Sequence, residues 1–256
     1  MKKLWVMSLV LLLASCSGEI VTEKPITNLQ NETLDAAIEI IAKMREAHGV
    51  KNIDGKEITF SFRDKVYSRY SLNNQYGYSR SALNEEGKMV IDSWRGDDFK
   101  RTINNVEVQI TDKEENAYKN SINSVFYFAL LPLSLSDPAV NVELLGDSKL
   151  KGKKYTKLRV TFDEEGGGED FNDVFIYWMN KETNTMDFLA YQYFTEGGGI
   201  RFREAYNPRE VGGFLFQDYN NFKPTTGIEL IDMDKAFEMG EMEQVSEIVL
   251  EDIKVN

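Results

Sequence analysis

The only cysteine of this 256-residue chain, Cys16, ends a motif that directs covalent lipid attachment. Leu13-Ala14-Ser15-Cys16 follows a positively charged start and an apolar run of about ten residues, too short to span a bilayer. This order is typical of a bacterial lipobox, in which the cysteine sulfur receives a diacylglycerol and the leader is cleaved before it. We therefore predict a signal peptide over residues 1–15 and lipidation of Cys16. Two or more acyl chains, palmitate among them, would hold the protein stably at a membrane.

Residues that could perform catalysis are sparse. His48 is the only histidine, and it stands at the end of an expected helix, where histidine is typically a helix-terminal or core residue. The chain lacks G-x-S-x-G, H-E-x-x-H, a phosphate-binding glycine loop and EF-hand spacing. We predict no catalytic residue, no metal site and no cofactor, and interpret the protein as not an enzyme. A hydrolase would need paired carboxylates that no motif marks.

An acidic loop at residues 163–170, followed by Asn172 and Asp173, offers oxygen ligands for calcium. Its spacing matches no calcium motif, and we interpret the loop as a solvated hairpin tip. The whole chain has a net charge of −12, which argues against nucleic acid as a partner and against electrostatic attraction to anionic lipid. The predicted membrane contact is therefore the lipid on Cys16, at the bacterial cell envelope, with the outer membrane favoured over the inner. Protein partners stay open.

The remaining chain divides most simply into a lipidated tether, residues 16–32, and one domain, residues 33–256. Thr33 is a plausible N-cap and Gly49 a plausible C-terminal stop for an amphipathic helix between them. After this helix the apolar residues alternate with polar ones, which indicates antiparallel strands. We expect strands at 58–62, 66–72, 75–83, 88–95, 98–110, 140–145, 155–162, 174–179, 188–194, 200–206, 213–219 and 247–255. Residues 232–242 predict a further helical turn or two.

The most apolar internal stretch, residues 125–135, ends a second predicted helix. Thr111 with Glu114 three residues later is typical of a capping box, and Pro132 should end the helix by about Leu131. Since Cys16 already provides an anchor, we expect this stretch to turn inward as a plug or a lid. Two strands, 174–179 and 189–194, are apolar on both faces, so each is covered on both sides or lines a cavity.

The hairpin at residues 176–186 (IYWMNKETNTM) combines an aromatic strand, a Trp-x-Asn step and a Lys-x-Thr turn, and Lys157–Phe162 precedes it. It resembles the W-x-D-x-x-T hairpin of the lipoprotein-localisation factor superfamily (LolA/LolB-like) and uncharacterised envelope lipoproteins of similar pattern. The resemblance implies a mainly β (α+β) fold: a curved antiparallel meander forming a half-open barrel. The N-terminal helix and the hydrophobic mid-chain helix would pack on its concave side. Lipidation departs from the family's transfer chaperone, so a sorting role does not carry over.

The same resemblance implies a cavity that holds an acyl chain or another apolar ligand. The candidate lining residues are Val125, Phe126, Phe128, Leu131, Leu133, Phe175, Tyr177, Trp178, Tyr191 and Tyr193. We predict an anchored envelope lipoprotein that binds a lipid or an acylated molecule there. The alternative is an anchored structural or protein-interaction lipoprotein whose core is packed and which binds no ligand. A continuous apolar cavity beside residues 125–133 would favour the first.

Overall fold

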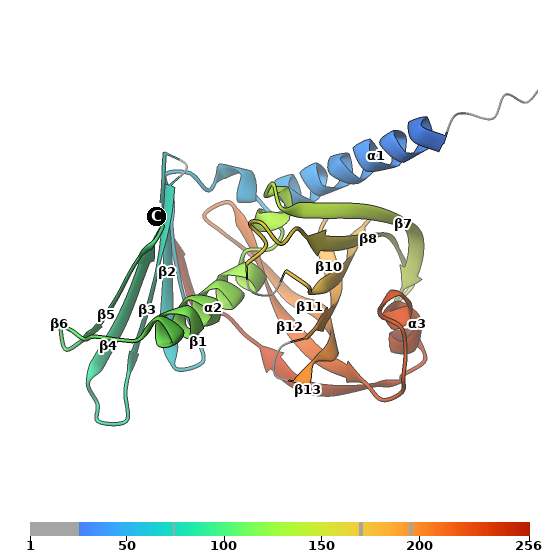
Figure 1. Cartoon of the computed structure of the whole chain (residues 1–256). Helices are drawn as coiled ribbons and strands as arrows, with labels where there is room; N and C mark the ends of the chain where they lie inside the picture. The colour runs from blue at the N-terminus through green and yellow to red at the C-terminus, as the bar shows by residue number, and fades with distance from the viewer. Residues whose placement is uncertain (1–25, 74, 169–170, 195–196) are drawn as a thin grey trace, which may run out of the picture.

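The computed structural model describes residues 26–73, 75–168, 171–194 and 197–256. It is mainly β, with two open antiparallel sheets of seven strands and three α-helices, and α2 passes between the sheets (Figure 1). This confirms the predicted mainly β, half-open fold with helices on its inner side. The predicted meander is divided into two sheets, a feature that the strand pattern did not show. The leader, Cys16 and most of the predicted tether lie outside the described residues.

Sheet A, at the left of Figure 1, has the strand order β14-β1-β2-β3-β4-β5-β6. Its strands are β1 (Glu57–Phe62), β2 (Lys65–Leu72), β3 (Gln75–Leu83), β4 (Met89–Arg95), β5 (Asp98–Ile103), β6 (Val106–Glu107) and β14 (Glu251–Val255). Asn73, Gly87, Asn104 and Asn105 adopt positive φ angles in the turns between them. Asn and Gly tolerate this left-handed region better than other residues. The turn at Asn104 and Asn105 divides the predicted strand 98–110 into β5 and β6.

Sheet B, at the right, has the order β13-β12-β11-β10-β9-β8-β7. Its strands are β7 (Val140–Leu150), β8 (Lys153–Phe162), β9 (Val174–Asn180), β10 (Met186–Tyr193), β11 (Gly199–Val211), β12 (Phe214–Pro224) and β13 (Met242–Ile248). The predicted strand 247–255 is wrong as a single element, because the chain leaves sheet B after Ile248 and joins β1 of sheet A as β14. Asp218 accepts a hydrogen bond from the Leu250 backbone at this crossing and pairs with Arg209 at 2.8 Å.

Helix α1 (Ile26–Ala47) begins earlier than the predicted cap at Thr33 and covers part of the predicted tether. Its end agrees with prediction, because Gly49 follows it with φ of 73°. A Cβ at Gly49 would also lie 1.9 Å from the Gly213 carbonyl oxygen, so glycine is required there for space as well as for backbone angle.

Helix α2 (Asp112–Ala129) has the predicted start and end. Thr111 and Glu114 form both hydrogen bonds of a capping box, and the helix stops before Pro132. A short 3₁₀ turn, η2 (Leu133–Ser136), then packs against α1, where Arg45 donates to the Leu133 carbonyl.

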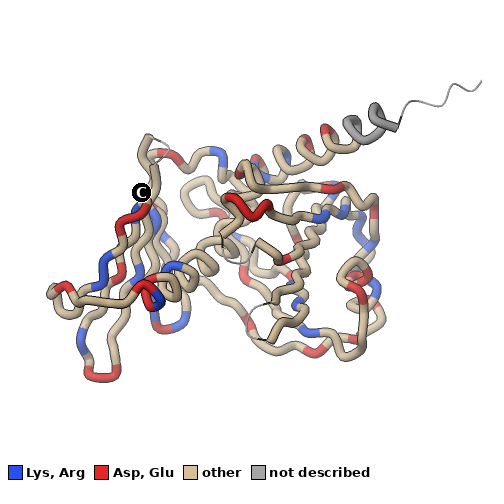
Figure 2. The backbone as a smooth tube through the Cα atoms, viewed as in Figure 1, with Lys and Arg blue, Asp and Glu red and all other residues tan. Residues whose placement is uncertain are grey.

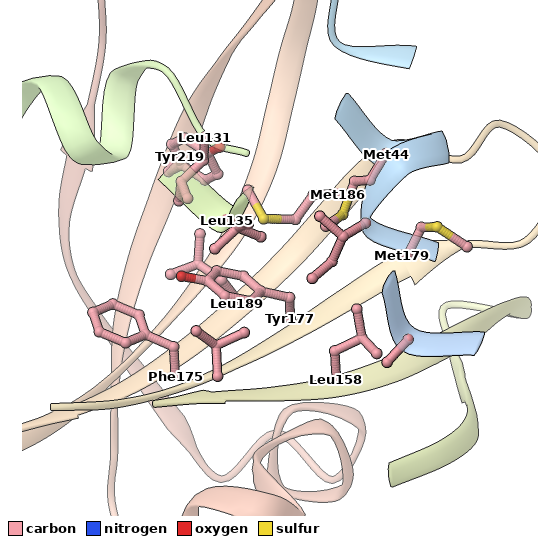
Figure 3. Close-up of a cluster of buried hydrophobic side chains, with 13 residues drawn as sticks. Met44, Leu131, Leu135, Leu158, Phe175, Tyr177, Met179, Met186, Leu189 and Tyr219 are labelled. Carbon is pink, nitrogen blue, oxygen red and sulfur yellow. The ribbon is translucent and has the colours of Figure 1, made fainter. Parts of the chain in front are cut away.

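Sheet B is covered on both faces, which explains its doubly apolar strands. Its inner face, turned toward α2, packs on α1 and η2 in one apolar cluster (Figure 3). Its outer face packs under η4 (Leu230–Asp232) and α3 (Met233–Glu238) in a second cluster. The predicted helical turns at 232–242 are thus the outer cover. No described helix is long and apolar enough to cross a membrane.

Candidate functional site

A pocket of about 540 Å³ lies where the C-terminal half of α2 passes between the two sheets. It is bounded by α2, by the β1–β2 turn of sheet A and by the inner face of sheet B from β10 to β13. Ligand sites in proteins commonly enclose roughly 300–1,000 Å³. The pocket is therefore of a size suited to a small organic molecule or an acyl chain.

Much of the pocket wall is apolar. Its apolar and aromatic lining residues are Phe62, Val125, Phe128, Ala129, Tyr191, Tyr219, Ile248 and Leu250. Helix α2 contributes no charge to this wall, because the chain carries no charged residue from Asn120 to Ser136 (Figure 2). A wall of this composition gains free energy when it is covered by an apolar ligand, at about 25 cal/mol per Å² of apolar surface.

The pocket also has a polar part, on strands β11 to β13. Arg203, Gln217, Asn221 and Ser246 line it, and Asn221 lies directly opposite both Arg203 and Ser246 in the strand register. The Arg203 guanidinium stands 3.8 Å from the centre of the Phe128 ring and donates from Nη2 to the Tyr191 hydroxyl at 2.9 Å. The pocket thus combines an apolar wall with a buried cation.

Three of the ten predicted cavity residues line this pocket: Val125, Phe128 and Tyr191. Phe126 and Leu133 belong instead to the core between α2 and sheet A. Leu131, Phe175 and Tyr177 lie in the cluster between α1 and sheet B (Figure 3). The stretch 125–135 therefore fills the space between the sheets and also borders the pocket.

The remaining two predicted residues are not part of the pocket lining. Trp178 is on the outer face of sheet B, fully buried, where its indole N–H donates to Asp234 of α3 at 3.4 Å. Asp234 also pairs with Lys157 at 3.0 Å. Because successive strand residues point to opposite faces, Trp178 cannot share a face with Tyr177. Tyr193, near the end of β10, stands beside Arg201 and is absent from the described lining.

A tyrosine pair joins α2 to the floor of sheet B beside the pocket. The hydroxyl oxygens of Tyr127 and Tyr177 are 2.6 Å apart. Burial raises the pKa of both phenols well above the ordinary value, so both stay neutral. Such a pair satisfies two buried hydroxyls and fixes the position of α2 over sheet B.

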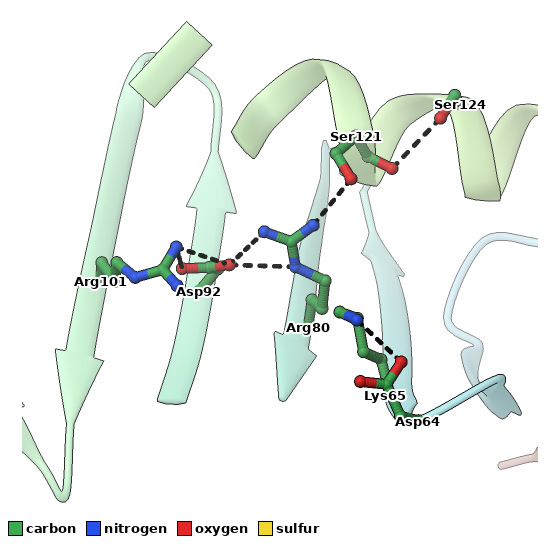
Figure 4. Close-up of polar contacts among 7 residues, drawn as sticks. All are labelled: Asp64, Lys65, Arg80, Asp92, Arg101, Ser121 and Ser124. Carbon is green, nitrogen blue, oxygen red and sulfur yellow. Dashed lines mark hydrogen bonds and ion pairs between the residues drawn. The ribbon is translucent and has the colours of Figure 1, made fainter. Parts of the chain in front are cut away.

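Sheet A has a polar contact of another kind with the same helix (Figure 4). Arg80 of β3 donates to Asp92 of β4 from Nη2 at 2.6 Å and from Nε at 3.0 Å, and to Ser121 of α2 at 2.9 Å. Arg101 of β5 lies 3.1 Å from the other Asp92 oxygen. These four side chains bond to one another, and none of them lines the pocket.

His48 has the structural role that its position indicates. It is 1% exposed, and its Nε2 accepts a hydrogen bond from the Met186 backbone at 3.0 Å. Desolvation lowers its pKa from 6.5 to about 4, against a smaller opposing effect of Asp187. The described residues hold no group of three or more metal-ligating side chains. Glu169 and Asp170 of the acidic loop lie outside the described residues.

A family model, described as a family of unknown function (DUF6503), matches residues 2–248. The chain belongs to the DUF6503 family. No curated protein matches it. The DUF6503 chain is similar to the solved structure of a LolA superfamily protein from Nitrosomonas europaea, with 11% identity and a TM-score of 0.44, covering 86% of this chain and 91% of that one. It is also similar to a putative outer membrane lipoprotein-sorting protein domain from Vibrio parahaemolyticus, with 9% identity and a TM-score of 0.41, covering 81% and 98%.

Sequence reasoning missed the polar part of the pocket in this DUF6503 chain. Arg201 and Arg203 alternate with apolar residues, a pattern typical of a solvent-facing strand face. Only the pairing of Arg203 with Leu189 and Asn221 reveals that its side chain faces inward. A strand register of this kind is fixed by long-range contacts, so no local signal could have found it.

Proposed function

We propose that this protein is a lipid-anchored envelope protein that binds an apolar ligand, a lipid or an acylated molecule, between α2 and sheet B. The observation that carries the proposal is the 540 Å³ pocket whose wall includes the uncharged half of α2. The ligand would be held by burial of its apolar surface, and 100 Å² would contribute about 2.5 kcal/mol. The proposal is for a binding protein and involves no catalytic step.

Lipid on Cys16 would keep the pocket close to a membrane, the source of such ligands. A Cys16→Ala variant should lose incorporation of radiolabelled palmitate and should leave the membrane fraction. Wild-type protein that fractionates with membranes without incorporating palmitate would contradict the anchor.

The ligand is tested on residues 17–256, which contain every described helix and strand. We expect mass spectrometry of an organic extract to find a co-purifying lipid, and a fluorescent fatty-acid probe to bind after lipid removal. Ala129→Phe, which fills the pocket from α2, should weaken probe binding at least tenfold. Ala117→Phe is the matched control, because Ala117 is exposed on the same helix and away from the pocket. The proposal would be wrong if no lipid co-purifies and the fluorescent probe does not bind.

A packed, ligand-free interaction protein is the second candidate. It is favoured by the burial of Phe126, Leu130 and Leu131, which shows that most of this apolar stretch already has partners within the chain. Under this candidate the extract holds no lipid, Ala129→Phe and Ala117→Phe behave alike, and cross-linking in the envelope recovers a protein.

A further inference from the structure

The polar part of the pocket contains a buried charge without a countercharge. Arg203 is 7% exposed, and its Nε and Nη1 have no hydrogen-bond partner. Within the described ranges its side chain donates one hydrogen bond, to the neutral Tyr191 hydroxyl, and forms no ion pair with a carboxylate. A guanidinium has five N–H donors and stays charged, so this arrangement leaves most of its donors unused in a desolvated place.

Two amide oxygens beside Arg203 also lack a partner. The Gln217 Oε1 and Asn221 Oδ1 atoms are buried without a partner, and both residues line the pocket with Arg203. The Asn221 amide is oriented by its Nδ2, which donates to the Ser246 hydroxyl at 3.1 Å. The Gln217 amide can present either its N–H₂ donor or its oxygen acceptor according to its rotation. Three pocket-lining side chains therefore contain polar atoms that are buried without a partner, a combination that is rare in protein structures.

Arg69 on sheet A is a useful contrast, because its Nε and Nη1 also lack partners. Its guanidinium lies over the rings of Tyr76 and Tyr78, and its positive charge interacts electrostatically with the Asp137 carboxylate. Among the described residues, Arg69 itself lines no pocket, although Tyr76 and Tyr78 line a second one of about 460 Å³. Of the two arginines, only Arg203 is itself part of a pocket lining.

We propose that the pocket binds a single-chain amphiphile head first, with Arg203 as the counter-ion of the ligand's carboxylate. This rests on the proposed function, since it names the class of ligand for the same pocket. Arginine pairs with a carboxylate through two parallel hydrogen bonds, which come from Nη2 together with either Nε or Nη1. Nε and Nη1 of Arg203 have no partner, and Nη2 carries a second N–H beside the one that donates to Tyr191. A phosphate dianion fits less well, because one buried cation would leave its second charge uncompensated.

The pocket's geometry sets the orientation of this ligand. Its carboxylate lies against Arg203 and Gln217 on sheet B, and its chain runs along Val125, Phe128 and Ala129 of α2. The other cation of the lining, Arg63, is exposed in the β1–β2 turn. Because it is exposed, we assign it to the mouth, where the ligand's chain would leave the pocket.

The test compares ligands that share a dodecyl chain and differ in the head: dodecanoate, dodecanol, methyl dodecanoate and dodecyl phosphate. Displacement of a fluorescent probe from delipidated residues 17–256 gives their affinities at pH 8. We expect dodecanoate to bind roughly 10- to 100-fold more tightly than dodecanol, because a charge-assisted hydrogen-bonded pair typically raises affinity by this factor. Dodecyl phosphate should bind more weakly than dodecanoate.

Arg203→Met should reduce dodecanoate affinity to that of dodecanol and leave dodecanol binding intact. Arg63→Met is the matched control and should keep the preference. Arg203→Gln, which keeps a polar group, should lose the preference as well, and it serves if the Met variant fails to fold.

Equal binding of dodecanoate and dodecanol to wild type would overturn the head-first assignment while leaving the apolar-ligand function intact. Loss of the preference in Arg63→Met but not in Arg203→Met would place the head at the mouth and overturn it too. Tighter binding of the phosphate would overturn the carboxylate. If no dodecyl ligand displaces the probe, or no probe binds, the proposed function itself fails.

Discussion

Arg80 on sheet A and Arg203 on sheet B are both buried on the faces turned toward α2, at 8% and 7% exposure. All three nitrogens of Arg80 donate, two to Asp92 and one to Ser121 (Figure 4). Arg203 has one nitrogen engaged, by a neutral hydroxyl. Two similar charges in similar places are thus compensated on one sheet and left uncompensated on the other.

The difference separates a group that holds the fold together from one that is available to a ligand. A buried charge costs several kcal/mol in desolvation, which an opposite charge with good hydrogen bonds can repay. Arg80 recovers that cost through Asp92. The contacts of Arg203 with the rings of Phe128 and Tyr191 recover only about 0.5–2 kcal/mol. Its remaining deficit is what an anion would remove.

The largest expected effect comes from breaking the compensated side. Asp92→Ala leaves Arg80 and Arg101 without their carboxylate and should lower the free energy of unfolding by about 3–5 kcal/mol. Urea denaturation monitored by circular dichroism measures it. Asp98→Ala, which removes an exposed pair with Lys100, is the control and should cost below about 0.5 kcal/mol. Equal costs would show that sheet A does not depend on its buried pair.

Lowering the pH tests another buried group, His48, which is bound to strand β10 of sheet B. Its folded pKa of about 4 lies below the ordinary 6.5, so its contribution is complete above pH 6.5 and is lost as pH falls toward 4. The loss amounts to about 3 kcal/mol, because protonation charges a buried ring and removes the acceptor for the Met186 amide.

His48→Gln keeps a hydrogen-bond acceptor and cannot titrate, so its free energy of unfolding should fall less steeply between pH 6.5 and 4. Urea denaturation at several pH values in this window gives the two slopes. Identical slopes would assign the acid sensitivity to other groups.

Local signals predicted those parts of the fold that local chemistry decides. Thr111, Glu114 and Pro132 set the ends of α2 through caps and a missing N–H, and all three act as expected. The N-cap predicted at Thr33 was wrong, because α1 already starts at Ile26 and Thr33 lies inside the helix. Glu247–Val255 reads as one strand, but Asp218 and Arg209 bind the chain at Leu250 and divide it between the sheets.

The site was less accessible to sequence reasoning. The apolar stretch of α2 was recognised, and strand alternation alone separates Trp178 from Tyr177. Arg203 was not recognised, since its inward orientation follows from its pairing with Leu189 of β10 and Asn221 of β12. Whether a charge is balanced depends on side chains that meet only in the folded protein.

A smaller effect sharpens the contrast between the two ends of α2. Thr111→Ala removes the cap that accepts from the Glu114 amide and should lower stability by about 1 kcal/mol. The pocket begins at Ser124, so probe affinity should stay unchanged while the unfolding midpoint falls. Thr111→Ser, which restores the hydroxyl, is the matched control. A parallel loss of probe binding would mean that the capped end controls the pocket.

The smallest expected effect on stability is the most informative. Arg203→Met removes a buried charge that has no carboxylate partner and keeps a side chain able to pack on Phe128. The relieved desolvation should at least offset the lost ring contact, so the ligand-free variant should be no less stable than wild type. Arg80→Met, at similar burial, should instead lower the free energy of unfolding by several kcal/mol, because it leaves the buried Asp92 carboxylate without its Arg80 partner. Urea titrations of the delipidated variants compare them directly. If Arg203→Met costs as much as Arg80→Met, then Arg203 is as structural as Arg80, and the asymmetry between the sheets is not a sign of ligand binding.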